Sequence, residues 1–455
     1  MVKTLVIPGV SVEVLKEIIP QQLYPSGVVA MMGATEKGKP LLPEHVTNFR
    51  EFAEKFGTSD AFPIVNDARQ AFQNGVFEIV VVSLAGKGGE TASLTLKDRA
   101  DNNTIQLIAN AGGEAGNKIK VAVEPGTAPD SVKLTFGDIA SVIEIWDNLV
   151  MDRRSDNNLV KFINNNSSMI TAKDLKSIAK YPANNPMEIQ TALSGGTTGV
   201  ISKEDYEVAL EHLEGEAEVD IVYAPDVSDP AIHALVESHC MRMSLDAKNR
   251  IGIGTVARDE SVDDICKRTT NLASDRFVLV APYGYAGAVA GLISRLNYYD
   301  SPTFKALSGI AKIEPRPYLP SEQMKLLNNG ILPLDAIKGR GIVIVKGITT
   351  SKEQISVMRI ADHSVRGVNS IAYLFIGSLN NDTGRSALKS NIEGFMRGME
   401  REGSIVPSTD GTEPPFMVDV YSSQLDFGQG IVRVAMAVRP VRAMDYIYAT
   451  IKVEA

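Results

Sequence analysis

Three consecutive strand–helix units in the second half of the chain constrain its fold more than any other feature. From residue 219, three short apolar runs are each followed by a longer segment with helical periodicity. The apolar runs are VDIVYAP, RIGIGTVA and RFVLVAP, and the helical segments are DPAIHALVESHCMRMSLDAK, SVDDICKRTTNLA and GYAGAVAGLISRLN. Strands that alternate with helices in this way form a parallel sheet with helices on its faces. With one further strand in GRGIVIVKG, the sequence predicts a central α/β domain at residues 181–347.

A first part of the same domain is expected at residues 26–88, after an N-terminal arm of residues 1–25. The segment VVAMMGATEKG predicts a buried strand that runs into a loop, and VFEIVVVSL predicts a second apolar strand. Two helices are expected between them, in PEHVTNFREFAEKFG and IVNDARQAFQNG. In the first helix Val46, Phe49, Ala53 and Phe56 share a stripe, and Gly57 is its stop signal.

A β-rich insertion is expected at residues 89–180, because short alternating segments replace the α/β rhythm there. Gly, Asn, Asp and Pro separate the segments TASLTLKD, TIQLIANAG, KIKVAVEPG and SVKLTFGD. This spacing is typical of a small β-sandwich or barrel. The segment NNLVKFINNNSSMITA is expected to lead out of it.

Two helices and a terminal β-ribbon are expected in an α+β C-terminal domain at residues 348–455. The second helix, predicted for residues 383–403, has an apolar stripe of Leu388, Ile392, Phe395, Met396 and Met399. Basic residues recur at four-residue steps on its polar side, at Arg385, Lys389, Arg397 and Arg401, with Glu393 among them. By default this is a solvated face, and the alternative is a docking face for an acidic partner.

Both ends of the chain carry a strand-like alternation. Near the N-terminus the alternating apolar residues are Val10, Val12 and Val14. Between Tyr446 and Val453 one face of a strand would carry Ile447, Ala449, Ile451 and Val453. Since chain ends are usually polar and frayed, such strands need a partner sheet.

Charge and composition narrow the function classes. The net charge of −9 and the pI of about 5.3 argue against non-specific nucleic-acid binding, which requires a basic face. Cys240 and Cys266 suggest no disulfide framework, so both are expected to be reduced. Neither a signal peptide nor an apolar run of membrane-spanning length is found, and a soluble, cytoplasmically made protein is expected.

Three weak patterns in the sequence resemble chemical sites. Gly252, Gly254 and Ala257 match the spacing of a dinucleotide fingerprint, but the glycines lie inside the expected strand and no acidic residue ends a strand about twenty residues later, so small residues that pack a sheet under a helix are the preferred interpretation. His233, Glu237 and Cys240 would share a helix face and are metal-ligand types; a partly exposed helix with one buried thiol is the plainer interpretation. The run Asp362, His363 and Ser364 does not make a triad, because adjacent helical residues point in different directions. No catalytic, cofactor or metal residues are predicted.

The order of segments along the whole chain resembles the tail sheath proteins of contractile phages and related injection systems. PGVSVEV is similar to their opening arm, FREFAEKFG with ARQAFQNGVFEIVVVSL to their first α/β part, and LSGGTTGVISKEDYEVALEHLE to the start of their central domain. The segments EAGNKIKVAV through MITA resemble their β-sandwich insertion, and LPLDAIKGRGIVIVKG the close of the central domain. The most similar stretch lies in the C-terminal domain, at IAYLFIGSLNNDTGRSALKSNIEGFMRGMEREGSI and VRPVRAMDYIYATIKV.

This resemblance implies a structural protein with a subtilisin-like central fold and no triad. It implies a helical homopolymer that surrounds an inner tail tube, contacts baseplate and tail terminator proteins, and contracts to drive the tube through a cell envelope. It also implies that the terminal strands add to the sheets of neighbouring copies, that the basic face of the 383–403 helix meets the tube, and that the insertion points outward. The location would be the virion tail, after assembly in the host bacterial cytoplasm, with no nucleic acid bound and no membrane insertion. An α/β hydrolase-like enzyme and a monomeric binding module stay open as alternatives.

Overall fold

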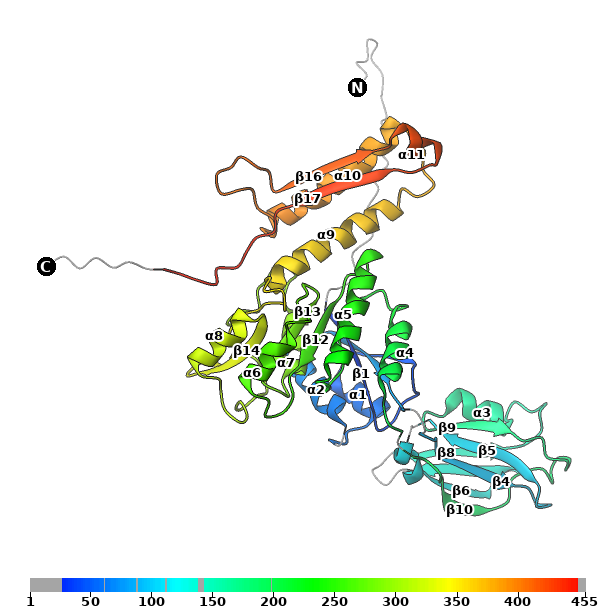
Figure 1. The fold of residues 1–455 in the computed structure, drawn as a ribbon. Coiled ribbons are helices and arrows are strands. Elements are labelled where there is room, and N and C mark those ends of the chain that lie inside the picture. Colours follow the sequence, from blue (N-terminus) through cyan, green and yellow to red (C-terminus); the bar gives the residue numbers. More distant parts are fainter. Residues whose placement is uncertain are drawn as a thin grey trace, which may run out of the picture. The chain divides into compact units, whose positions relative to one another are not determined.

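The computed structural model describes residues 27–60, 62–86, 89–110, 113–137, 143–197 and 199–448, which form two compact units. The larger unit comprises residues 27–358 together with residues 442–448. The smaller unit comprises residues 359–441. Figure 1 shows the elements of both units.

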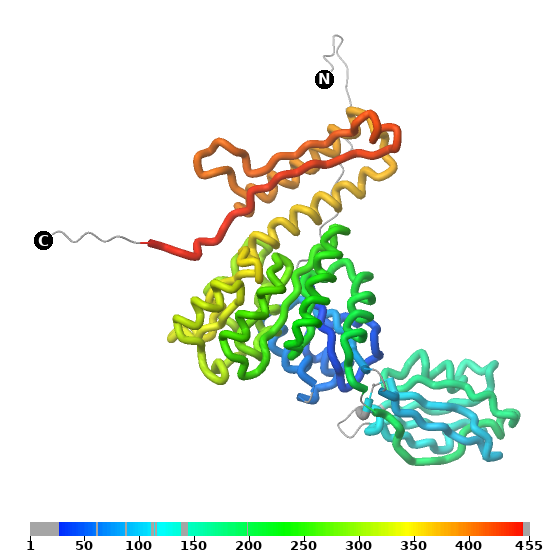
Figure 2. Tube along the Cα trace, in the orientation of Figure 1, coloured from blue at the N-terminus to red at the C-terminus, as the bar shows by residue number. Residues whose placement is uncertain are grey.

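An eight-stranded sheet forms the centre of the larger unit, in the order β15-β14-β13-β12-β11-β1-β3-β2. From β3 to β14 neighbouring strands are parallel, whereas β2 and β15 pair antiparallel at the two edges. Figure 2 shows that β1, near the start of the described chain, lies beside β11, which comes from the middle of the chain. The strands are β1 (Val28–Gly33), β2 (Pro43–Val46), β3 (Glu78–Ser83), β11 (Val219–Tyr223), β12 (Ile251–Thr255), β13 (Phe277–Ala281), β14 (Ile331–Ile337) and β15 (Gly341–Ile344).

Helices cover both faces of this sheet, and each face has its own apolar core. Because successive side chains of a strand point to opposite faces, Met31 of β1 enters one core and Met32 enters the other. On the first face lie α1 (Phe49–Phe56), α2 (Pro63–Gln73) and α7 (Ala286–Arg295). On the second face lie α4 (Lys203–Leu213), α5 (Pro230–Leu245), α6 (Val262–Arg268) and α8 (Pro320–Asn328). This arrangement confirms the predicted α/β fold class.

The β-rich insertion consists of two antiparallel sheets, β10-β6-β7-β8 and β4-β5-β9, that share one core. Leu107 of one sheet and Phe136 of the other are both fully buried in that core. A helix, α3 (Leu159–Asn166), and a 3₁₀ turn at Gly113–Lys118 complete the insertion. Its strands are β4 (Ser93–Lys97), β5 (Asn103–Ala109), β6 (Lys120–Pro125), β7 (Val132–Gly137), β8 (Ile143–Leu149), β9 (Ile170–Asp174) and β10 (Ile189–Ala192).

Two expectations about the insertion are corrected. The segment expected to lead out of it forms α3 and β9, and β9 pairs with β5 inside the insertion. The insertion also continues past the expected end at residue 180, because β10 pairs antiparallel with β6. The strand β10 has only four residues and a partly exposed face, so its alternation is too short to be recognised.

A third correction concerns residues 43–57, which were expected to form one helix. Pro43–Val46 is the edge strand β2, paired with β3, and α1 begins only at Phe49. The Asn48 side chain caps α1 by accepting a hydrogen bond from the Glu51 N–H at 2.9 Å. Val46 therefore belongs to the sheet core and not to the helix stripe.

The smaller unit packs helix α10 (Asp382–Arg401) against an antiparallel ribbon of β16 (Phe416–Tyr421) and β17 (Arg433–Val438). Helix α9 (Ile355–Tyr373) leads into it, and a short helix α11 (Gln424–Gly428) connects the two strands. Among the stripe residues predicted for α10, Leu388, Ile392, Met396 and Met399 are buried and Phe395 is half-buried. Among the helices that the structure describes, none combines the length and apolar character that a membrane span requires.

Candidate assembly surfaces

The glycine pattern of β12 and the candidate metal residues of α5 serve packing. A Cβ atom at Gly252 or Gly254 would lie 2.7 or 2.6 Å from the Phe277 ring, so only glycine leaves room there. His233 is buried; its Nε2 lies 2.9 Å from Val227 O and its ring centroid 5.3 Å from that of Phe277. Burial lowers the pKa of His233 to about 4, which keeps its ring neutral. Among the described residues no group of three or more metal-binding side chains comes together.

The Asp362–His363–Ser364 run lies on α9 in a helical packing environment. The Ser364 hydroxyl donates to Ile360 O at 2.9 Å, one turn back along its own helix. The His363 ring packs on Phe395, with 5.6 Å between the ring centroids. These contacts place the two side chains within the α9–α10 packing of the smaller unit.

A cleft of about 1260 Å³ opens at the carboxyl ends of β11, β12 and β13, where α/β sheets commonly bind ligands. The residues that line it in the described chain include neither a histidine nor a cysteine. Charged groups at its rim pair with one another, as in the two hydrogen bonds of 2.8 Å from Arg316 to Glu322. The buried Asp67 carboxyl faces it, with a pKa raised to about 8 by burial and by Asp226. Asp67 is therefore mainly neutral at pH 7. The Ser261 hydroxyl at the cleft donates to Asp264 Oδ2 at 2.6 Å, in the cap of helix α6.

The tube-facing candidates lie along α10, each beside an acceptor of its own unit. Arg385 donates to Asn380 Oδ1 at 2.8 Å and to Asp382, and Lys389 Nζ lies 3.9 Å from Asp419 Oδ1 of the ribbon. Further along the helix, Arg397 pairs with Glu393 at 3.3 Å. Arg401 donates from Nε to Arg397 O at 3.3 Å.

The exposures of these side chains differ. The Arg397 side chain is 66% exposed, whereas that of Arg385 is 20% exposed. The structure thus presents Lys389, Arg397 and Arg401 to solvent more than Arg385.

An exposed apolar cluster occupies one end of the smaller unit and was not predicted from the sequence. Asn380 Nδ2 donates to Ser422 Oγ at 3.3 Å and to Ile431 O at 3.5 Å, which brings the segment after α9 beside the α11 connection. Large apolar side chains from both segments are largely exposed, with values from 58% to 79%: Tyr373, Ile376, Leu379, Leu425 and Phe427. Exposed apolar groups of this size and number mark interaction surfaces.

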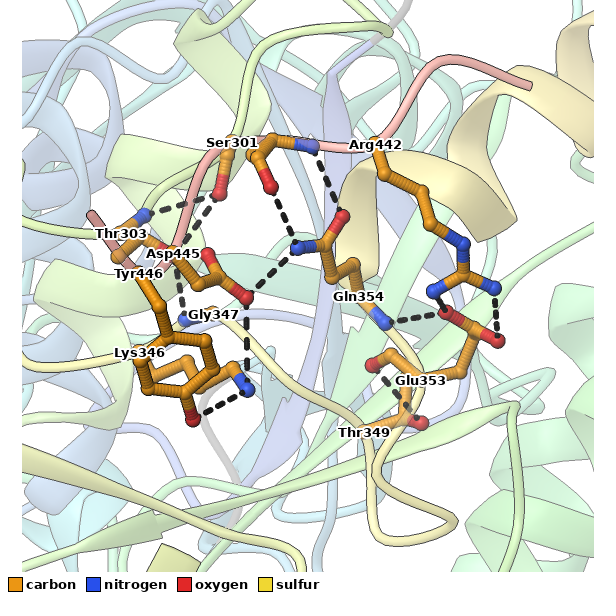
Figure 3. A network of polar contacts seen from close by, with 11 residues as sticks. Ser301, Thr303, Lys346, Gly347, Thr349, Glu353, Gln354, Arg442, Asp445 and Tyr446 are labelled. Carbon is orange, nitrogen blue, oxygen red and sulfur yellow. Dashed lines mark hydrogen bonds and ion pairs between the residues drawn. The ribbon is translucent and has the colours of Figure 1, made fainter. Parts of the chain in front are cut away.

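The C-terminal segment is held on the larger unit, to which it belongs, by a network of polar contacts (Figure 3). We call this network the clasp. The clasp joins two parts of the larger unit. One part is the residues before and after the turn that precedes α9, and the other is the chain segment that begins at Arg442, after the smaller unit. Its members are Lys346, Glu353 and Gln354 on the body, and Arg442, Ala443, Asp445 and Tyr446 on the segment.

Gln354 is the centre of the clasp. Its Nε2 donates to Ala443 O at 3.2 Å, and its Oε1 accepts the Ala443 N–H at 3.0 Å. The same Nε2 donates to Asp445 Oδ2 at 2.6 Å. The residue is only 7% exposed, so these bonds are shielded from water. The carboxamide thus takes the place of a neighbouring strand for Ala443.

Two charged contacts flank this amide. Arg442 forms a bidentate pair with Glu353, with N–O distances of 2.8 and 3.1 Å. Lys346 Nζ lies 3.4 Å from Asp445 Oδ2 and 3.2 Å from the Tyr446 hydroxyl, over a ring whose centroid is 4.9 Å away. Burial alone would raise the pKa of Glu353 and lower that of Lys346, but these partners outweigh it and shift both pKa values in the opposite direction. Both groups are therefore charged at neutral pH.

The turn before α9 places the body side of the clasp. Ile348 and Gln354 form an antiparallel bridge, and the Thr349 N–H donates to Glu353 O at 2.9 Å. Gly347 donates to Thr303 Oγ1 at 3.1 Å, and a Cβ atom there would lie 2.4 Å from Pro302. Backbone pairing therefore orients Gln354 toward the segment.

Of the residues predicted for the two strand arms, only Ile447 lies within the described chain. It is 82% exposed and the adjacent Tyr448 is 94% exposed. Residues 446–448, the described part of the predicted strand, take part in no strand of the described chain. The other predicted arm residues lie outside the described residues: Val10, Val12, Val14, Ala449, Ile451 and Val453.

Comparisons with known proteins agree on one family. Residues 199–350 match the family model described as the phage tail sheath protein central domain, and no curated protein matches the sequence. The chain is similar in structure to a sheath tail protein from Listeria innocua, with a TM-score of 0.69, 17% identity and 93% of each chain covered. A sheath tail protein from Desulfitobacterium hafniense matches at a TM-score of 0.63 and 15% identity, over 90% of this chain and 93% of that one.

The third similar structure is the helical sheath of the anti-feeding prophage in its contracted state, with a TM-score of 0.58, 11% identity and 99% of each chain covered. At these identities the likeness shows the fold, and the family match supplies the relationship. The resemblance noted in the sequence is thereby confirmed. Residues 199–350 thus match the central domain of phage tail sheath proteins, and the fold of the chain is similar to that of tail sheath proteins.

Proposed function

We propose that the protein is a structural sheath subunit that polymerises as a helix around an inner tube and contracts to drive the tube through a cell envelope. The observation that carries this proposal is the match of residues 199–350 to the sheath central domain. The similarity to sheath proteins over 93% of the chain supports the same role for the insertion and the C-terminal domain. The role is mechanical and needs no catalytic site.

Strand addition between copies is the contact that best explains the chain ends. The ribbon β16–β17 is a two-stranded sheet, and within the described chain its outer edges have no strand partner. Open edges carry unpaired N–H and C=O groups that bind a further strand. The alternation at Val10–Val14 and Ile447–Val453 fits such added strands, supplied by neighbouring copies.

The exposed apolar cluster of the smaller unit supports assembly independently of the arms. Tyr373, Ile376, Leu379, Leu425 and Phe427 would remain in water in a single subunit. Their burial against another subunit would stabilise the polymer by roughly 25 cal/mol for each Å² of apolar surface removed from water. A polymer therefore satisfies groups that the single chain leaves exposed.

Contraction would then be a switch between two packings of rigid subunit bodies that stay joined through their arms. The energy resides in the metastable extended lattice, which forms during assembly. The inner tube is the expected partner of α10, through Lys389, Arg397 and Arg401 against an acidic surface. Such exposed charge pairs are weak and screened by salt, which suits a contact that has to release on contraction.

Further partners and location follow from the same role. The baseplate and the tail terminator would cap the two ends of the polymer. The assembled sheath belongs to a virion tail or an injection machine, and we place its assembly in the cytoplasm of a bacterial host.

Negative-stain microscopy and sedimentation of the purified full chain test the proposal directly. We expect tubes or large oligomers that form above a threshold concentration. A chain that stays monomeric at high concentration, in the presence of its tube protein as well, would refute it.

A further inference from the structure

We infer that the clasp is a positioning device for assembly: Gln354, Lys346 and Asp445 hold the root of the C-terminal arm on its own subunit, so that the arm departs from a fixed point toward a second copy of this chain. The inference rests on the proposed function and deepens it. It assigns the residues that control the start of the arm.

The clasp acts at the two places where the chain enters and leaves the smaller unit. Glu353 and Gln354 directly precede α9, through which the chain enters that unit. Arg442 is the first residue after the smaller unit. The clasp thus joins the segment through which the chain enters the smaller unit to the segment through which it leaves. The 87 residues between them, counted from residue 355 to residue 441 inclusive, form a loop whose two ends the clasp holds together.

The chemistry of the clasp is specific to the groups present. Ala443 needs both a donor and an acceptor from one side chain, which a carboxamide offers and a carboxylate does not. Asp445 is covered, with its side chain 8% exposed, and three donors reach it: Gln354 Nε2, Lys346 Nζ and, at 3.5 Å, Thr303 Oγ1. Because the polar Asp445 side chain is largely removed from water, loss of these donors would favour its release into solvent.

Because the clasp already holds residues 442–446 in place, it lowers the entropy cost when a neighbouring copy binds the arm. Ile447 and Tyr448 beyond the clasp are largely exposed, so side chains that a second copy could bind begin directly after the held segment. With the clasp open, five more residues would have to be ordered whenever a neighbour binds the arm, and each ordered residue has an entropic cost. Preorganised segments bind more tightly for this reason.

Two variants open the clasp in different ways. Gln354→Ala removes the amide, and Gln354→Glu keeps the size and one acceptor but loses the donor that Ala443 O and Asp445 require. Gln323→Ala is the matched control, because Gln323 Nε2 likewise donates to a backbone carbonyl, that of Tyr318 at 3.0 Å, at the start of another helix of the larger unit. Circular dichroism and thermal unfolding identify any variant that fails to fold.

Hydrogen exchange in the unpolymerised full chain reports whether the clasp is closed. We expect a peptide that includes the Ala443 amide to be protected in the unmodified chain and in the control. Exchange should be at least tenfold faster in both Gln354 variants. An unprotected peptide in the unmodified chain, or unchanged exchange in the variants, would overturn the inference.

The critical concentration for polymerisation, measured by sedimentation, reports on the positioning role. We expect both Gln354 variants to polymerise only at concentrations at least tenfold higher, and the control to match the unmodified chain. Opened clasps with an unchanged critical concentration would overturn the positioning role. If the unmodified chain formed no polymer, the proposed function would fail, while hydrogen exchange would still decide whether the clasp is closed.

Discussion

Asp67 is a single carboxyl group that the fold removes from water and places near a second carboxyl, Asp226. The unfolded chain binds its proton with a pKa of 3.8, and the folded chain with a pKa of about 8. Between these values the folded state binds more protons, so the residue destabilises the fold increasingly as pH rises from 4 to 8. We expect Asp67→Asn to raise the free energy of unfolding by on the order of 2–4 kcal/mol at pH 8 and to change it little near pH 4.

Urea denaturation at both pH values measures this difference. Asp60→Asn is the control, since Asp60 is an exposed carboxyl on the same cleft that pairs with Arg69 at 3.4 Å. Its removal should leave the pH dependence of stability unchanged. If Asp67→Asn showed the same pH dependence as the unmodified chain, the carboxyl would be ionised in the folded state.

Helix α10 is the element through which tube binding can be tested. Lys389→Glu with Arg397→Glu should abolish assembly around tubes, because both reversals place negative charge before an acidic surface, but should spare polymers that lack a tube. The double variant Lys203→Glu with Lys267→Glu is the control: those lysines also lie beside acidic residues of their own helices, α4 and α6, at 3.7 and 2.7 Å. Micrographs of sheaths assembled with purified tubes distinguish the two. Tube-templated assembly that survives the α10 reversals would refute the assignment.

The C-terminal arm is the second element with a direct test. Ending the chain after Tyr446 removes residues 447–455 but keeps the clasp, so the truncated chain should unfold at the same temperature and fail to polymerise. Ile447→Asp should weaken polymerisation more than Thr450→Asp, since strand alternation places them on opposite faces. A truncation that unfolds part of the subunit would show that the strand serves its own fold.

The sequence predicted correctly those strands and helices whose apolar residues form a long stripe on one face or a continuous run. The β11, β12 and β13 strands are buried on both faces and read as apolar runs, and α5, α6 and α7 follow them in order. The edge strand β15 was predicted from its apolar run, whereas the other edge strand, β2, gave no such signal. Pro43–Val46 has only one buried residue, so its pairing with β3 depends on the neighbouring strand rather than on its own composition.

The candidate functional surfaces also differ in whether a local sequence pattern predicts them. The basic row on α10 could be predicted because its members recur every four residues on one helix. Gln354 and Asp445 are 91 positions apart, and the Gln354 carboxamide also pairs with the backbone of Ala443. No local sequence pattern predicts such a contact. The exposed apolar cluster likewise arises from two distant segments, the end of α9 with the residues after it and the α11 connection, which the Asn380 hydrogen bonds bring together.

At the scale of the whole molecule, several weak contacts are expected to act together. Each arm, the apolar cluster and the α10 surface would contribute modestly alone. Once one contact forms, the others become intramolecular and their effective concentration rises. Assembly should therefore have a sharp concentration threshold, and release of one class of contact during contraction need not dissociate the lattice.

The β-rich insertion should be dispensable for folding of the rest of the chain. It has its own apolar core, and its two connections to the α/β sheet run together: Glu90 and Thr197 exchange backbone hydrogen bonds of 3.1 and 2.9 Å. A Cβ atom at Gly89 would lie 2.8 Å from Gly199 N, so the two ends are close enough for a short linker. Replacing residues 91–196 by a few Gly and Ser residues should leave the eight-stranded sheet folded, as circular dichroism and thermal unfolding would report.

The same deletion tests where the insertion lies in the sheath. If it points outward and takes no part in the lattice, the shortened chain should still polymerise, and its tubes should be narrower in negative-stain images with the same axial repeat. A shortened chain that folds but forms no tubes would place the insertion within a contact between subunits. A matched chain that carries the same Gly and Ser residues inserted after Gly89, with the insertion retained, separates the effect of the linker from the loss of the domain.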